Sequence, residues 1–63
     1  MNEIYITYTN NETLKFSSLS TAKAYTLDLF FSNIHAVKLR ATGSDFVALQ
    51  DYIAELSTIT HIN

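Results

Sequence analysis

The 63-residue chain has no Cys, no Pro, no Trp and only one Gly. Without Cys it cannot form disulfides, use a thiolate nucleophile or build a Cys-based zinc site. One Gly cannot supply a glycine-rich loop that cradles phosphate, nor the G-x-S-x-G turn of a serine hydrolase. These absences exclude several large classes of enzyme.

Long apolar runs and an excess of one charge are also missing. No stretch approaches the roughly 20 apolar residues that span a bilayer, and Met1-Asn2-Glu3 lacks the basic region of a signal peptide. The net charge of -2 is typical neither of nucleic-acid-binding proteins nor of their acidic mimics. We therefore expect one small soluble domain over residues 1–63, cytoplasmic and without membrane contact.

What the chain does have is a high share of apolar residues, including four Tyr and four Phe. Ordering a chain costs roughly 1.5 kcal/mol per residue, and domains this short bury too little surface to offset that cost easily. Because disulfides are excluded, self-association is the expected source of further stability, and we predict a homodimer.

The first part of the chain predicts a β-hairpin. Residues 3–9 (E-I-Y-I-T-Y-T) alternate, with Ile4, Ile6 and Tyr8 on one side. Residues 13–17 alternate again, and Asn10-Asn11-Glu12 between the two runs favours a tight turn because Asn tolerates positive φ. Leu14 and Phe16 continue the apolar side in the second run.

Residues 21–32 predict a helix that is apolar nearly all round. Ser20 is the preferred N-cap, and Asn33 is expected to end the helix. One apolar row consists of Ala22, Tyr25 and Leu29, a second of Ala24, Leu27 and Phe31, and Phe30 lies between them.

The second half predicts a strand and another helix. Residues 34–41 alternate, with Val37 and Leu39 expected toward the core. After Thr42-Gly43, Ser44 is expected to cap a helix with an acidic first turn. Its apolar stripe would be Phe46, Leu49, Ile53 and Leu56, and residues 57–63 would form a short fourth strand or a tail.

The predicted fold is therefore α+β, in the order ββαβα. We expect a three-stranded antiparallel sheet in the spatial order 2-1-3, covered on one face by two helices. The alternative places the third strand beside the second as a parallel pair.

The residues that could perform chemistry are sparse. His35 and His61 share no metal-binding motif, and Asp51 and Glu55 lie one turn apart on a solvated helix face. We expect no enzyme activity, no metal or organic cofactor, and no small-molecule substrate.

The apolar surplus of the first predicted helix favours a protein-binding function. Phe30 and Phe31 lie about 100° apart on a helix, so both cannot face one sheet. The strand–helix–strand stretch over residues 14–40 has a generic shape found in many tiny phage and mobile-element proteins, which favours a regulator or inhibitor of a larger host protein. The predicted interface residues are Tyr25, Leu27, Phe30, Phe31 and Tyr52.

Nucleic-acid binding is the alternative function. Alternation along the predicted strands places one ring and three of the four basic residues on the outer face of the sheet, and such a face can stack bases and neutralise phosphates. These residues are Tyr5, Lys15, Lys38 and Arg40.

Overall fold

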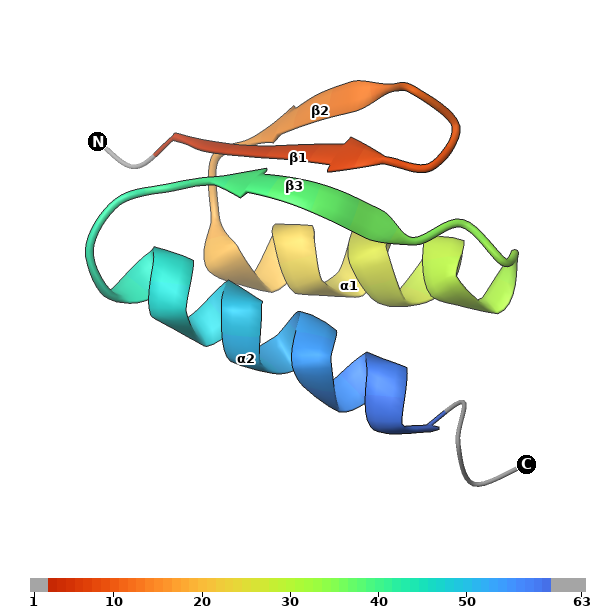
Figure 1. Ribbon diagram of the computed structural model, residues 1–63. Helices are drawn as coiled ribbons and strands as arrows, with labels where there is room; N and C mark the ends of the chain where they lie inside the picture. Colours follow the sequence, from red (N-terminus) through yellow and green to blue (C-terminus); the bar gives the residue numbers. More distant parts are fainter. Residues whose placement is uncertain (1–2, 60–63) are drawn as a thin grey trace.

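The computed structural model describes residues 3–59 and confirms the predicted order of strands and helices (Figure 1). The elements are β1 (Ile4–Tyr8), β2 (Thr13–Phe16), α1 (Leu19–Phe31), β3 (Ala36–Arg40) and α2 (Ser44–Ile59). Neither helix of this described part is long and apolar enough to cross a membrane.

The three strands form one sheet in the order β2-β1-β3, with β1 antiparallel to both neighbours. This confirms the predicted topology and excludes the parallel pairing of β2 with β3. Both helices lie against one face of the sheet, so the other face is open (Figure 1). The core forms between these layers, where Ile4, Ile6 and Leu49 are fully buried.

The hairpin follows its local sequence. The alternating side chains of β1 give the predicted buried row, with Tyr8 only 1% exposed. In the turn, Asn11 adopts a φ of 69°, and the side-chain oxygen of Asn10 accepts the N–H of Glu12 at 3.1 Å. Asn residues thus supply both the left-handed conformation and the local hydrogen bond of the turn.

The predicted N-cap of α1 is wrong by two residues. Ser18, not Ser20, has the extended backbone of a cap, and its Oγ accepts the N–H of Thr21 at 3.3 Å. A cap must lie three residues before that N–H, so Ser20 falls inside the first turn. The predicted C-terminal end is confirmed: Asn33 has a φ of 66°, and Ile34 N–H donates to the Leu29 carbonyl at 2.9 Å.

The side of α1 that faces the sheet keeps Ala22 and Leu29 of the first predicted row but has Thr26 instead of Tyr25 between them. It carries Ala22 and Thr26, both buried, between the partly buried Leu19 and Leu29. Tyr25 remains 43% exposed at the side of the helix. The apolar period alone could not indicate this side, because a polar residue, Thr26, occupies its centre.

A register shift in β3 also corrects the prediction for Val37. Lys38 pairs with Thr7, but the next residue of β1, Tyr8, pairs with Ala36, so Val37 has no partner on β1. This irregularity changes the phase of the alternation. Ala36 and Leu39 therefore pack against the core, whereas Val37 is 64% exposed instead of buried.

The second helix agrees closely with its predicted stripe. Leu49 and Leu56 are buried, Phe46 and Ile53 are half-buried, and Asp45 lies in the first turn as expected. The helix begins at Ser44 and continues to Ile59, so the strand suggested for residues 57–63 is wrong for residues 57–59. Residues 60–63 lie outside the described part of the chain.

Candidate functional site

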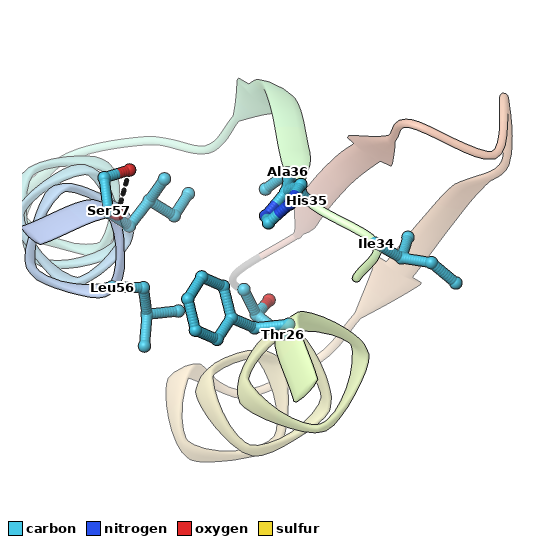
Figure 2. Close-up of a pocket in the computed structure, with 8 residues that line it drawn as sticks. Thr26, Ile34, His35, Ala36, Leu56 and Ser57 are labelled. Atoms are coloured by element: carbon cyan, nitrogen blue, oxygen red, sulfur yellow. Dashed lines mark hydrogen bonds between the residues drawn. The ribbon is translucent and has the colours of Figure 1, made fainter. Parts of the chain in front are cut away.

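A cavity of about 130 Å³ lies between the C-terminal halves of the two helices and the start of β3. Thr26 of α1 lies across it from Leu56 and Ser57 of α2, and His35 and Ala36 close it beside the sheet (Figure 2). Among the described residues, the lining consists of Thr26, Phe30, Ile34, His35, Ala36, Ile53, Leu56 and Ser57.

The hydroxyl groups in this wall are engaged within the protein. The Thr26 hydroxyl is hydrogen-bonded to the Tyr8 hydroxyl at 2.9 Å, and Ser57 Oγ donates to the Ile53 carbonyl at 3.2 Å. Burial raises the pKa of Tyr8 above 10.0, although the hydrogen bond with Thr26 opposes that shift. Most of the remaining wall is hydrocarbon, so the cavity suits an apolar occupant.

A second hollow, the edge groove, runs between β3 and α2. Its volume is about 260 Å³, and it adjoins the cavity because Ala36 and Ile53 line both. We refer to the cavity and the edge groove together as the apolar hollow. The groove is lined by Ala36, Val37, Lys38, Leu39, Phe46, Gln50 and Ile53.

A small aromatic cluster extends the apolar hollow to the molecular surface. The Phe30 ring, which lines the cavity, lies edge-on to His35 at 5.4 Å and to Phe31 at 6.0 Å between centres. Phe31 is 76% exposed. The two neighbouring phenylalanines therefore point in different directions, as the angle between successive residues of a helix requires: Phe30 points toward α2 and Phe31 toward solvent.

The structure does not gather all five predicted interface residues in one place. Phe30 and Phe31 lie together, whereas Tyr25 packs edge-on against Phe16 at 5.7 Å. The Tyr52 ring lies 5.4 Å from Lys23 Nζ, between the helices, and Leu27 is half-buried. The hollow adds residues that sequence reasoning had assigned to the core or missed: Ala36, Val37, Phe46, Ile53 and Leu56.

The four residues of the predicted nucleic-acid surface do share the open face of the sheet. Tyr5 pairs with Lys15 on β2 and with Arg40 on β3, and Lys38 lies two residues from Arg40 on the same strand. The Arg40 guanidinium lies 5.6 Å from the centre of the Tyr5 ring. Lys15 forms an exposed ion pair with Glu3 at 3.5 Å, which reduces the positive charge available there.

Charge is therefore separated between the two layers. The open sheet face holds three cations and one anion, Glu3. The helices hold one cation, Lys23, and four anions: Asp28, Asp45, Asp51 and Glu55. This polarity is hidden in a net charge of only -2.

Within residues 3–59, no three His, Asp or Glu side chains come together as a metal site would require, and His61 lies outside this part. Each buried side-chain polar atom in the same range has a hydrogen-bond partner. Comparison of the chain with protein-family models, with curated proteins and with solved structures found no match.

Proposed function

We propose that this protein is a non-enzymatic binding domain that holds a segment of a larger protein in the apolar hollow. The observation that carries the proposal is that the cavity and the edge groove lie next to each other and share Ala36 and Ile53 in their walls. Apolar pockets of this kind accept the anchoring side chains that contribute most binding energy at protein interfaces. The exposed Val37 and Phe31 extend the same surface.

The division of the apolar hollow into a small cavity and an adjoining groove suits a polypeptide, which offers one anchoring side chain and a flanking segment. An apolar cavity of about 150 Å³ accepts a benzene-sized group. The cavity of about 130 Å³ therefore matches one aliphatic or aromatic side chain. A small domain that binds in this way is suited to act as a regulator or inhibitor of its larger partner.

The proposal is tested by affinity capture with two matched variants. Val37→Glu places a charge in the edge groove, and Val47→Glu places the same charge at a valine outside the apolar hollow. Both valines are exposed, at 64% and 57%, so both variants should keep the fold. Circular dichroism melting curves verify this before capture from extracts of the source cell, and mass spectrometry identifies the captured proteins.

We expect one partner to be captured by the wild type and by Val47→Glu but lost with Val37→Glu. Desolvating a carboxylate against apolar walls would weaken such a contact by at least tenfold. Capture that is equal for both variants, or absent for the wild type, would contradict the proposal.

A second candidate function, nucleic-acid binding, is supported by the strand register that gathers Tyr5, Lys15, Lys38 and Arg40. A partly exposed ring between cations, such as Tyr5, can stack on a base while the cations contact phosphates. Neutralising about three phosphates gives a slope of log affinity against log salt near -2 to -3.

This second candidate is tested with fluorescent single-stranded DNA and RNA oligonucleotides. If the protein binds nucleic acid through this face, the oligonucleotides should bind with that salt slope. Lys38→Glu should then abolish binding, whereas Lys23→Glu, which reverses the same charge on α1, should leave it unchanged. A protein partner held by apolar contacts would show little salt dependence. Absence of oligonucleotide binding at low salt would exclude the candidate.

A further inference from the structure

The edge groove follows the free edge of β3. This strand ends the sheet order, and within residues 3–59 it pairs only with β1. Four successive residues, Ala36 to Leu39, line the groove. Because the groove meets Ala36 and Leu39 on the core side as well as the exposed Val37 and Lys38, it runs along the edge of the strand. There, backbone N–H and C=O groups point away from β1.

Two kinds of surface flank this edge. On the helix side the groove is walled by Leu39, Phe46 and Ile53. On the other side lies Lys38, which lines the groove and belongs to the open face of the sheet; Arg40 shares that face, but its guanidinium lies over the Tyr5 ring. Lys38 has no ion-pair partner among the described residues, and the one anion on that face, Glu3, is paired with Lys15. The free edge of β3 is therefore apolar on the side of the helices and positively charged on the side of the open sheet face.

We propose, on the basis of the binding function above, that the partner segment is an extended strand that pairs with β3 and alternates apolar with acidic side chains. Its backbone would hydrogen-bond the free edge. Its apolar side chains would enter the edge groove, and its carboxylates would lie beside Lys38. β3 has five residues, so a segment of about the same length suffices.

The same charges disfavour pairing between two copies of this chain at β3. Antiparallel pairing of two such edges would bring the cations of both copies close together, and like charges on neighbouring strands are destabilising. Such charges protect a sheet edge from self-pairing while leaving it open to an acidic strand.

The experiment uses two displayed libraries of seven-residue peptides and the immobilised full-length protein. In one library apolar positions alternate with Asp or Glu, and in the other with Lys or Arg. We expect binders only from the acidic library. Their affinity should fall about tenfold with Lys38→Glu and change less than twofold with Lys23→Glu, because reversal replaces attraction with repulsion only beside the groove.

Backbone N-methylation of the best peptide then tests strand pairing itself. Methylation of an N–H that faces β3 removes a hydrogen bond and blocks approach, whereas the next N–H along faces away. We expect losses of at least tenfold at every second position. A peptide bound as a helix, or by side chains alone, would not show this period.

The outcomes distinguish a failure of the strand-pairing proposal from a failure of the proposed protein-binding function. Three outcomes would contradict the proposal that the partner segment pairs as an acidic strand. These are binders from the basic library, no binders at all, and affinity losses on methylation without a two-residue period. The proposed function would still stand if a cellular partner depended on Val37. If no captured partner depends on Val37, the proposed function itself fails.

Discussion

The hydroxyl groups of Tyr8 and Thr26 lie 2.9 Å apart in the core, although 18 residues separate them in the sequence. Tyr8 comes from the central strand and Thr26 from the side of α1 that faces the sheet. Both residues are almost completely buried, at 1% and 2% exposure. The observed rotation of α1 over the sheet therefore satisfies both buried hydroxyls, which would otherwise carry a desolvation cost.

A double-mutant cycle measures this pair. We expect Thr26→Val and Tyr8→Phe each to lower the free energy of unfolding by about 1–3 kcal/mol, since each leaves one buried hydroxyl unsatisfied. The double variant should lose less than the sum of the two, because it leaves no orphaned hydroxyl. Urea denaturation followed by circular dichroism gives the values. Additive losses would show that the hydrogen bond is not energetically coupled.

The free energy of unfolding should fall in alkaline solution, because the buried Tyr8 hydroxyl loses its proton there. Burial holds the pKa of Tyr8 above 10.0 in the folded state, so the folded protein binds this proton more tightly than the unfolded chain. The resulting stabilisation is complete below the unfolded pKa and is lost as the pH rises through the folded pKa. Denaturation curves from pH 8 upward check this. Tyr8→Phe should show a weaker decline than the wild type, and equal declines would contradict the assignment.

Replacing Asn33 with a residue that tolerates a left-handed backbone poorly should destabilise the protein. Its φ is 66° at the residue after the helix cap, Ser32. Asn33→Ala should lower the free energy of unfolding by about 1 kcal/mol, whereas Asn33→Gly should leave it equal or slightly higher. Thermal and urea unfolding provide the comparison. Equal losses in both variants would indicate that the Asn side chain, rather than the backbone, matters here.

Self-association stays a prediction, and Phe31 is the residue that tests it most cleanly. Because Phe31 is 76% exposed, Phe31→Ser should change stability by less than about 0.5 kcal/mol. If α1 contributes to a dimer interface, the same variant should raise the dimer Kd by about tenfold or more. Val47→Ser, at an exposed valine of α2, is the control.

Analytical ultracentrifugation over a concentration series gives the Kd of each form. The dimer prediction is wrong if the wild-type protein sediments as a monomer at high micromolar concentration and its melting temperature does not depend on concentration.

The local sequence was sufficient wherever one short segment carried the whole signal. Alternation along residues 3–9 predicted both the strand β1 and its buried side. The stripe of α2 was equally clear, because charged and polar residues occupy its opposite side. The turn at Asn11 and the helix end at Asn33 were predicted because few residue types accept a positive φ. Short connections and a helical crossover then sufficed for the sheet order.

The candidate site was predicted only in pieces. Phe30 and Phe31 were singled out because adjacent rings cannot face one sheet, but Ile53 and Leu56 read simply as core. Whether a half-buried side chain closes a core or lines a cavity depends on how far two helices diverge. Helix spacing is set by side chains from both elements, so no single segment contains it.

Backbone preferences and apolar periods act over a few residues, so local segments specify the set of elements, their order and most of their buried positions. The rotation of α1, the exposure of Val37 and the apolar hollow depend instead on contacts between distant segments. α1 is apolar nearly all round, and the side that faces the sheet is the one that brings Thr26 to the hydroxyl of Tyr8 on a distant strand. The exposure of Val37 follows from the register of β3 on β1, a pairing of residues far apart in the chain.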